Sequence, residues 1–339
     1  MNKIKVGIVG AGSFFLKRYL EEINNEKKIV LTSLCRTNKK NLKKVGKLTK
    51  IKKLYTNAES MYKNEKLDFV LITSPHTKHF EHIKQALLNK INVLVEKPLV
   101  VNKIEKEKIK LIIKKSKKKI ISIFNPAYES HFCDLNQKIK NKRFGNIKYV
   151  NIFWSDNKKN LYKINKYITS NNIKSKNFRF KKNNTDGSVL FDSTSHLIAE
   201  LLWITKKVPK QVYACADSQI KPLSIKMSFN FGDNLYSDVN IICDAKHKKR
   251  KFESVYWGDY QKITIKGKPV KMIIENLKNN KIFFKNKFKN VNNPIQEMVD
   301  YLIVNKKPLL SLKLSLNVIS ILLAVEKSFK SKSLVNIEY

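Results

Sequence analysis

The first 124 residues alternate short, apolar, β-branched runs with longer amphipathic stretches, and this rhythm constrains the fold more than any other feature. Strands that alternate with helices in this way build βαβ units on a parallel sheet. The expected strands are 5–9, 29–35, 69–73, 92–95 and 120–124, and the expected helices are 14–22, 39–48, 79–88 and 104–115. The pattern predicts an α/β domain over residues 1–124 with a doubly wound parallel sheet.

From residue 125 onward the pattern changes to alternating or β-rich runs separated by turns. Such alternation is typical of an antiparallel sheet with one face covered. The expected strands are 146–154, 211–217, 224–231, 236–244, 249–257 and 262–266, the expected helices are 192–204, 294–304 and 311–329, and 157–184 is expected to be a long loop. We therefore expect an α+β domain over residues 125–339 with a large, mostly antiparallel, open sheet.

A glycine-rich turn follows the first strand. Gly10 permits a tight turn, and Gly12 allows the backbone to approach a pyrophosphate at the N-terminus of the next helix. Ser13 and Phe14 open that helix, and Phe15 occupies the third small-residue position of the pattern. Glycines of an ordinary βα turn are the alternative, but a strand before and a helix after the motif favour a dinucleotide site.

The end of the second strand bears on which nicotinamide nucleotide is bound. A carboxylate there would accept from the ribose 2′-hydroxyl and repel a 2′-phosphate. The sequence has no acidic residue between Glu26 and Glu59, whereas Arg36, Lys39 and Lys40 stand at that point. Arg36 can stack on adenine and pair with a phosphate, so NADP(H) is favoured and NAD(H) is the alternative.

The formal net charge of +42 raises the possibility of a nucleic-acid partner. Only five of the 69 basic residues are arginine, the residue whose planar fork binds phosphate bidentately, and the lysines are spread along the chain. Lysines spread along the chain are better explained by a lysine-rich background composition than by a surface dedicated to binding nucleic acid. We expect no specific nucleic-acid partner.

The cysteines, the apolar runs and the histidines indicate in which cellular compartment the protein is expected and whether it binds a metal. The four cysteines form no CxxC pair, which argues against a disulfide scaffold or a zinc ribbon. No apolar run reaches the roughly 18 residues that a membrane span needs, so we expect no membrane association. Residues 1–10 show no long apolar run with a small-residue cleavage site, so we expect cytoplasmic residence. His76, His79 and His82 drift around a helix at a spacing of three, and we expect no metal there.

Two motifs carry a family resemblance. Thr73-Ser74-Pro75 is followed by His79, and the fourth expected strand ends in Glu96-Lys97-Pro98. In these motifs the chain resembles the glucose–fructose oxidoreductase / inositol dehydrogenase / MocA (Gfo/Idh/MocA) family. The resemblance extends through 143–147, 186–187, Asp192 with His196, Glu253, the hairpin at 256–267 and the closing helices.

The resemblance implies an NAD(P)-dependent dehydrogenase or reductase that transfers a hydride between nicotinamide and a secondary alcohol or carbonyl of a sugar or polyol. Phosphorylated, acidic and nucleotide-linked sugars are among the candidate substrates, and a homodimer or homotetramer is expected. By resemblance the catalytic residues are Lys97, Asp192 and His196. The same resemblance places Thr73, Ser74, Pro75, His79, Glu96, Lys97 and Asn125 at the cofactor.

Residue chemistry supports these roles. Lys97 stands at the carboxyl end of a strand, where α/β sheets bind ligands, and a lysine there can donate to a substrate hydroxyl. Asp192 and His196 are four residues apart on an expected helix, so both project from one face, and histidine suits proton transfer near neutral pH. The alternatives are a surface lysine and a core histidine.

Three positions depart from the pattern of many relatives. Thr194 stands where a glycine is common, Ala199 where an aspartate is common, and Ala127 where an arginine is common. These changes leave a second hypothesis open, a catalytically weak, nucleotide-binding regulatory protein on the same scaffold.

Overall fold

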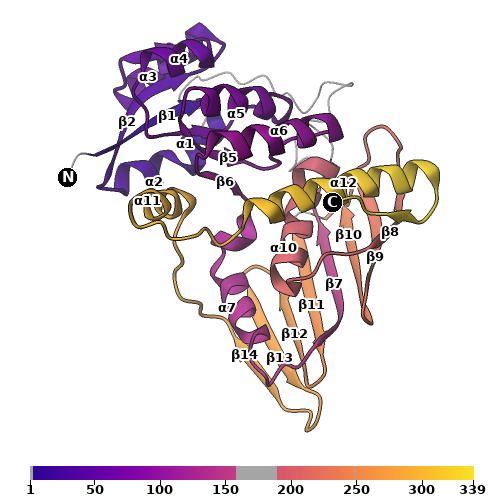
Figure 1. Ribbon diagram of the computed structural model, residues 1–339. Coiled ribbons are helices and arrows are strands. Elements are labelled where there is room, and N and C mark those ends of the chain that lie inside the picture. The colour runs from indigo at the N-terminus through magenta and orange to yellow at the C-terminus, as the bar shows by residue number, and fades with distance from the viewer. Residues whose placement is uncertain (1–2, 158–188, 248) are drawn as a thin grey trace. The chain divides into compact units, whose positions relative to one another are not determined.

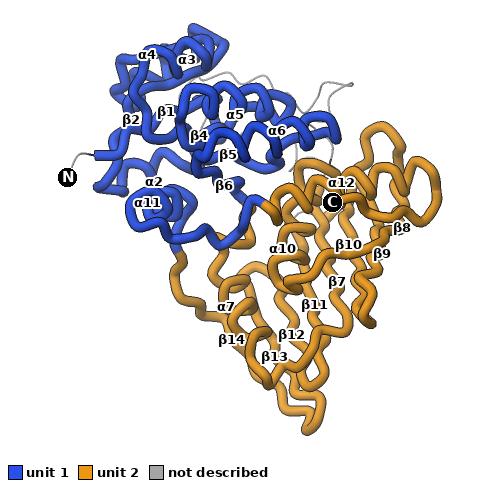
Figure 2. The backbone as a smooth tube through the Cα atoms, in the orientation of Figure 1, with its two compact units in different colours: residues 1–123, 164–186, 292–312 blue, residues 124–163, 187–291, 313–339 orange. Residues whose placement is uncertain are grey.

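The computed structural model describes residues 3–157, 189–247 and 249–339. These residues form two compact units (Figure 2). Of the described residues, the first unit contains 3–123 and 292–312, and the second contains 124–157, 189–247, 249–291 and 313–339. The expected loop at 157–184 lies outside the described residues apart from Asn157, as do residues 186–187.

The first unit is built on a six-stranded sheet whose strands are all parallel. The strands are β1 (Ile4–Val9), β2 (Ile29–Cys35), β3 (Lys53–Tyr55), β4 (Phe69–Ile72), β5 (Asn92–Glu96) and β6 (Ile120–Ile123). Their order, β3-β2-β1-β4-β5-β6, is that of a doubly wound dinucleotide-binding fold. Every residue of β4 and β6 is buried, which explains their unbroken apolar sequence. The predicted fold class of this region is confirmed.

Helices follow the strands of the first unit (Figure 1). They are α1 (Ser13–Arg18), α2 (Leu20–Asn25), α3 (Lys39–Thr49), α4 (Ala58–Asn64), the 3₁₀-helix η1 (His76–Lys78), α5 (His79–Leu88), α6 (Lys103–Ser116) and α11 (Pro294–Val304). Four of them, α3, α4, α6 and α11, begin after an asparagine whose side chain accepts a backbone N–H of the first turn: Asn38, Asn57, Asn102 and Asn293. Such caps satisfy an otherwise unpaired donor and fix where each helix begins.

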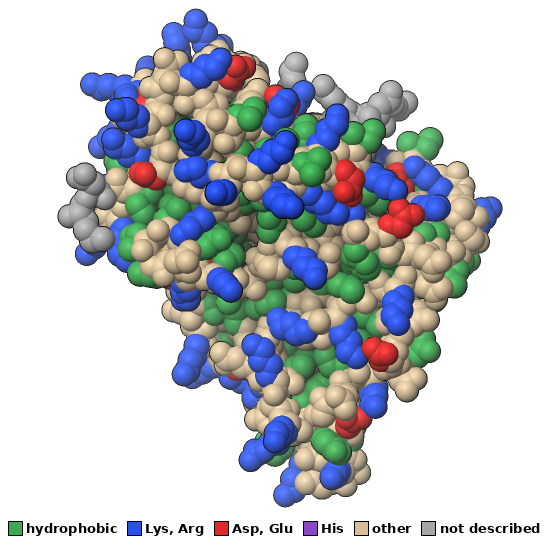
Figure 3. All heavy atoms as spheres, in the orientation of Figure 1, with side chains coloured by type: hydrophobic (Ala, Val, Ile, Leu, Met, Phe, Trp, Pro, Cys, Tyr) green, Lys and Arg blue, Asp and Glu red, His purple; other side chains and the backbone are tan. Residues whose placement is uncertain are grey.

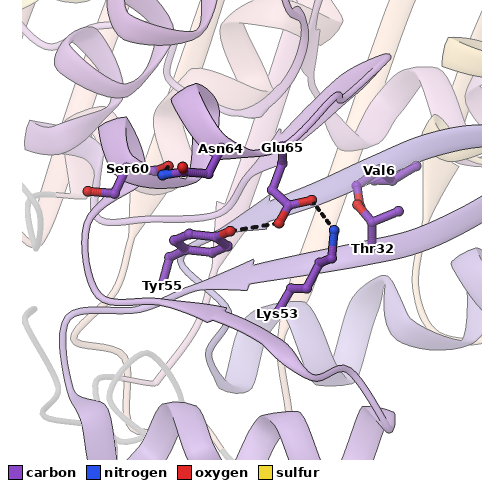
Figure 4. A network of polar contacts seen from close by, with 7 residues as sticks. All are labelled: Val6, Thr32, Lys53, Tyr55, Ser60, Asn64 and Glu65. Atoms are coloured by element: carbon purple, nitrogen blue, oxygen red, sulfur yellow. Dashed lines mark hydrogen bonds and ion pairs between the residues drawn. The ribbon is translucent and has the colours of Figure 1, made fainter.

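The short strand β3 and helix α4 were missed in the sequence, because three residues are too few to show a period. Their polar contacts centre on Glu65, the residue after α4 (Figure 4). Its carboxylate accepts from Tyr55 Oη at 2.6 Å and from Lys53 Nζ at 2.8 Å. Both partners lie on β3, so the pair of contacts fixes this edge strand to the end of α4.

The second unit contains a nine-stranded sheet in the order β14-β13-β12-β11-β7-β10-β9-β8-β15. The strands are β7 (Ile147–Ser155), β8 (Gln211–Ala216), β9 (Ser224–Gly232), β10 (Leu235–Ile242), β11 (Lys251–Gly258), β12 (Gln261–Lys266), β13 (Lys271–Asn276), β14 (Ile282–Lys285) and β15 (Val335–Asn336). All pairs are antiparallel except β7 with β10. The prediction of a largely antiparallel sheet is confirmed, although β13, β14 and β15 were missed.

Helices lie against one face of this sheet (Figure 1). They are the 3₁₀-helix η2 (Asn125–Tyr128), α7 (Ser130–Ile139), the π-helix η5 (Leu190–Thr194), α10 (Ser195–Thr205) and α12 (Leu312–Ser331). Alternate residues of β9 and β10 are buried, as a sheet with one covered face requires. The other face carries exposed Tyr213, Tyr236 and Trp257. The expected homodimer or homotetramer stays a prediction.

Helix α11 belongs to the first unit although it follows the strands of the second in sequence. The Lys119 ammonium donates to the carbonyl of Tyr301 and lies 4.6 Å from the centre of the Tyr301 ring. The chain therefore returns to the first unit at 292–312. A division into 1–124 and 125–339 assigns this segment to the second domain instead. The physical reason is local, since α11 buries Ile295, Met298 and Val299.

Lys and Arg side chains are scattered over the face seen in Figure 3, with few acidic side chains among them. This spread agrees with the interpretation of the net charge as background composition. Among the described residues, no helix is both long and apolar enough to cross a membrane.

Candidate active site

The glycine turn after β1 lies against the end of β4. Gly10 has a φ of +85°, and a Cβ atom at this position would lie 2.4 Å from the backbone nitrogen of Ser74. Thr73 Oγ1 donates to the carbonyl of Gly10 at 3.0 Å. Both the left-handed backbone and the close approach therefore require glycine here. The tight turn that the sequence motif predicts at Gly10 is present in the structure.

Gly12 immediately precedes α1 and leaves space for a ligand. A Cβ atom on Gly12 would meet Gly10 O and Arg36 Nη1 only at 3.5 and 3.6 Å, which is ordinary contact. Phe14 on the same turn is 48% exposed, whereas Phe15 is fully buried. A backbone with this free space at a helix start fits the pyrophosphate of a dinucleotide, which Gly12 and Ser13 would hold.

Arg36 follows β2 and reaches the same turn. Its Nη1 donates to the carbonyl of Ala11 at 3.2 Å, so the guanidinium lies beside the glycine loop. Burial lowers the pKa of Arg36 from its ordinary value of 12.5, but an arginine remains protonated in proteins. The structure thus brings a fixed positive charge to the edge of the loop, close to Gly12.

Ser74 and His82 are paired at the end of β4. Ser74 Oγ lies 2.9 Å from His82 Nδ1. Burial, and then the nearby His79 and Lys78, lower the pKa of His82 to about 4, so this ring is neutral at neutral pH. Pro75 comes next and opens the 3₁₀-helix η1. The Thr73-Ser74-Pro75 motif is therefore part of the same loop cluster as Gly10.

His79 is fully buried, and each of its ring nitrogens faces a backbone carbonyl. Nδ1 lies 2.7 Å from the oxygen of Pro98 and Nε2 lies 2.9 Å from the oxygen of Ser74. Carbonyl oxygens only accept, so a ring that is protonated on both nitrogens satisfies both contacts. His79 thereby joins the loop after β4 to the loop after β5. These contacts hold in place the backbone of Ser74, one of the predicted cofactor residues, and that of Pro98.

Glu96 and Lys97 end β5, and both are buried. Tyr19 Oη donates to Glu96 Oε1, which connects the end of β5 with the junction of α1 and α2. Burial raises the pKa of Glu96, and burial also raises the pKa of the neighbouring Glu22 to about 7. Tyr19 is a site residue that the sequence analysis missed, since a tyrosine within a helical pattern carries no signal of such a partner.

In the second unit, Asn125 and His196 are brought together. The backbone N–H of Asn125 points at His196 Nδ1 with a separation of 3.3 Å, and the ring of Phe124 meets the imidazole edge-on at 6.3 Å. An N–H that faces Nδ1 favours the neutral ring with its proton on Nε2. The contact is long for a hydrogen bond, so it restrains the ring only weakly.

Asp192 lies in the π-helix η5, directly before α10. The sequence predicts one α-helix over 192–204, whereas the structure has a wider π-turn at its start. Single π-turns at the start of an α-helix are common at functional sites. Asp192 and His196 are both half-buried on consecutive turns of this composite helix, as an i, i+4 pair should be.

One turn beyond His196, Glu200 attaches α10 to the sheet. Tyr256 Oη on β11 donates to Glu200 Oε1 at 2.6 Å, and both side chains are fully enclosed. Burial raises the pKa of Glu200 from 4.5 to about 7, although the hydrogen bonds from Tyr256 and Ser254 oppose that effect. A buried carboxyl with this pKa is half protonated at neutral pH.

Glu200→Gln is expected to change the pH dependence of stability. Because the folded-state pKa of Glu200 is above 4.5, its contribution to stability is complete below pH 4.5 and is lost as pH rises through 7. A pKa near 7 corresponds to a loss of about 3 kcal/mol across that window. Relative to the wild type, the variant should therefore gain about 3 kcal/mol between pH 4.5 and pH 8.

Urea unfolding at the two pH values measures this difference. Glu253→Gln, on the same strand as Tyr256 but half-exposed, is the matched control and should show no such gain. An equal stability difference at both pH values for Glu200→Gln would contradict the prediction.

Among the described residues, no three His, Cys, Asp or Glu side chains come together as a potential metal site. Two of the histidines that suggested one, His79 and His82, have ring nitrogens that face oxygen atoms of the protein instead.

A parallel sheet in the order β3-β2-β1-β4-β5-β6 with a glycine loop after β1 is typical of a dinucleotide-binding domain. The model of the oxidoreductase family with an NAD-binding Rossmann fold matches residues 4–124, and that of the GFO/IDH/MocA C-terminal domain matches residues 132–252. The chain belongs to the Gfo/Idh/MocA family of oxidoreductases, which confirms the resemblance.

Individual relatives are distant. The Uncharacterized oxidoreductase YgjR of Escherichia coli is 24% identical over 136 residues, which are 40% of this chain and 41% of that protein. The match thus spans less than half of the curated relative's length.

Two solved structures share the fold along nearly the whole chain. Myo-inositol 2-dehydrogenase of Lactobacillus plantarum is 18% identical, with a TM-score of 0.78 over 99% of this chain and 100% of that one. An oxidoreductase of Agrobacterium radiobacter, solved with NAD+, L-tartaric acid and magnesium, is 14% identical, with a TM-score of 0.81 over 99% and 98% of the two chains. At these identities the likeness shows the fold alone.

Proposed function

We propose that this protein is an NADP(H)-dependent oxidoreductase that transfers a hydride between nicotinamide and a secondary alcohol or carbonyl carbon of a sugar, polyol or sugar derivative. The observation that carries the proposal is Lys97, a buried lysine at the carboxyl end of β5 in a chain of this family. Ligands of doubly wound sheets bind at that end of the strands.

Each site residue has a role in the proposal. Gly10, Gly12 and Ser13 hold the pyrophosphate, and Arg36 binds the 2′-phosphate. When bound, the nicotinamide supplies or takes up the hydride. Lys97 donates a hydrogen bond to the reacting oxygen and stabilises negative charge on it, and Asp192 orients the hydroxyl.

His196 exchanges the proton with the substrate oxygen through Nε2, the ring nitrogen that does not face Asn125. For Nε2 to accept a proton, the ring must carry its other proton on Nδ1. The contact with the Asn125 N–H is then given up, and at 3.3 Å it is weak enough to be lost.

The experiment is a panel of polyols with NADP+ or NAD+ and of keto-sugars with NADPH or NADH, followed by nicotinamide absorbance. We expect turnover with at least one sugar or polyol. Tight cofactor binding without turnover on any member of the panel would favour the regulatory hypothesis.

That alternative depends on Thr194, Ala199 and Ala127. All three residues are fully buried, so their side chains are enclosed in packing and do not reach solvent. A different residue at a buried position changes the packing around it and does not directly change a contact with the substrate. This observation supports the enzyme over the regulator.

Arg36→Asp is expected to shift the cofactor preference. The substitution removes a charge-assisted partner of the 2′-phosphate and adds a carboxylate that repels it. The ratio of kcat/KM for NADPH to that for NADH should fall about 10- to 100-fold. Steady-state kinetics with both cofactors measures the ratio.

Arg36→Gln keeps a hydrogen-bond donor for the Ala11 carbonyl but removes the charge, so it separates the two effects. It should lose affinity for NADPH without gaining affinity for NADH. Lys52→Asp, an exposed lysine just before β3, is the control for general charge. An unchanged ratio in Arg36→Asp would mean that Arg36 does not select the cofactor.

A further inference from the structure

The basic run at 246–251 contains four lysines, His247 and Arg250, and the proposed function leaves it unused. Of its described residues, 246–247 and 249–250 lie in the loop that joins β10 to β11, and Lys251 is the first residue of β11. Because β10 runs parallel to β7, this loop stands at the carboxyl end of β7, beside Asp156. Arg250 is one of only five arginines in the chain.

The Arg250 guanidinium is held in place on two sides. Its Nε donates to Asp156 Oδ2 at 2.9 Å, and its Cζ lies 4.8 Å from the centre of the Trp154 ring. The Asp156 side chain is 2% exposed, whereas the Arg250 side chain is 47% exposed. Among the described residues, the terminal nitrogens of Arg250 have no hydrogen-bond partner. A fixed guanidinium thus presents its outer edge to solvent.

A second anchor holds the same loop. His247 Nε2 lies 2.6 Å from Ser155 Oγ, and the His247 carbonyl accepts from the Asn157 side chain at 3.4 Å. His247 Nδ1 is buried and, within the described part of the chain, has no hydrogen-bond partner. The contacts of Nε2 and of the carbonyl hold His247 beside the end of β7.

Arg250 and Asp192 both affect the pKa of the same thiol, that of Cys243. Cys243 follows β10 and is fully buried, and burial raises the pKa of its thiol. The charges of Asp156 and Asp192 raise that pKa further, and the charge of Arg250 lowers it. Arg250 therefore lies at the same end of the second unit as the proposed substrate residue Asp192.

We propose that Arg250, with the exposed Lys246, Lys249 and Lys251 beside it in the sequence, binds an anionic substituent of the substrate, a carboxylate or a phosphate, and that Arg250 is the principal donor. Guanidinium forks bind both groups bidentately. Asp156 offsets the charge of Arg250, but the exposed Lys246, Lys249 and Lys251 leave the loop strongly positive. This inference rests on the proposed function for the nature of the ligand, a sugar derivative.

Calorimetry of the full chain with NADPH, at 150 mM salt to screen the general charge, tests the proposal. The probes are glucose, glucose 6-phosphate, glucuronate and inorganic phosphate. We expect at least one anionic probe to bind about 10- to 100-fold more tightly than glucose. Comparison of glucose 6-phosphate with glucuronate tells whether the substituent is a phosphate or a carboxylate.

The variants are chosen so that the protein still folds. Arg250→Lys keeps the charge and loses the fork. A double variant, Arg250→Gln with Asp156→Asn, removes both charges and so leaves no unpaired buried carboxylate. Both should lose the preference for anionic probes. Arg143→Gln is the matched control, since this exposed arginine precedes the opposite end of β7.

Two results would overturn the proposal: no anionic probe binds more tightly than glucose, or the Arg250 variants keep the preference. Equal losses in Arg143→Gln would also overturn it, because they would indicate general charge. Because binding is measured without turnover, an Arg250-dependent preference in a protein that oxidises no sugar would sustain the site while the proposed function fails.

Discussion

His196→Ala is expected to lower kcat about 10²- to 10⁴-fold, the range that a positioned general acid or base contributes. The affinity for NADPH should change less than about threefold, because proton transfer is a transition-state interaction. Turnover measurements and NADPH fluorescence titration give the two quantities separately. Equal losses in turnover and cofactor affinity would mean that His196 is structural.

A second substitution makes the test of His196 sharper. The side-chain oxygen of asparagine can occupy the place of Nδ1 and accept from the Asn125 N–H, but asparagine cannot carry a proton. His196→Asn should therefore be as inactive as His196→Ala. Recovery of activity in the asparagine variant would assign His196 to the support of Asn125.

Lys97→Met should lower kcat about 10²- to 10³-fold, which is the cost of removing one donor to a developing oxyanion. Methionine keeps the length and the apolar stem of this buried side chain, so the loop after β5 should remain folded. The loss should appear in kcat and in kcat/KM together, because the interaction is strongest in the transition state.

Lys66→Met is the matched control for Lys97. Lys66 is exposed and precedes β4 at the end of the sheet opposite to Lys97. It should leave turnover unchanged. Activity that survives in Lys97→Met would contradict the proposed role, and a loss of NADPH affinity equal to the loss of kcat would instead assign Lys97 to the cofactor.

The first unit was predictable from sequence because its signals are local. Fully buried strands such as β4 appear as unbroken apolar runs, and Gly10 and Gly12 mark the turn after β1. The short edge strands β3 and β14 were missed, and all four residues of β14 are exposed or half-exposed, so they show no alternation of burial.

The site was only partly predictable. Glu96-Lys97-Pro98 was recognisable as a motif, but the partner of Glu96, Tyr19, was not. The separation of these two residues along the chain is long, and nothing in the local sequence of a tyrosine specifies a partner 77 residues away. The same holds for Glu200 with Tyr256 and for Asp156 with Arg250.

The sequence by itself determined the class of the protein, since the βαβ rhythm, the glycine turn and the Glu-Lys-Pro motif are all written in neighbouring residues. Only the tertiary structure decided which polar groups face one another: Arg36 with the glycine loop, His79 with two carbonyls, and Arg250 with Asp156. The physical reason is that hydrogen bonds and ion pairs act over a few ångströms in space, and folding sets those distances between residues far apart in the chain.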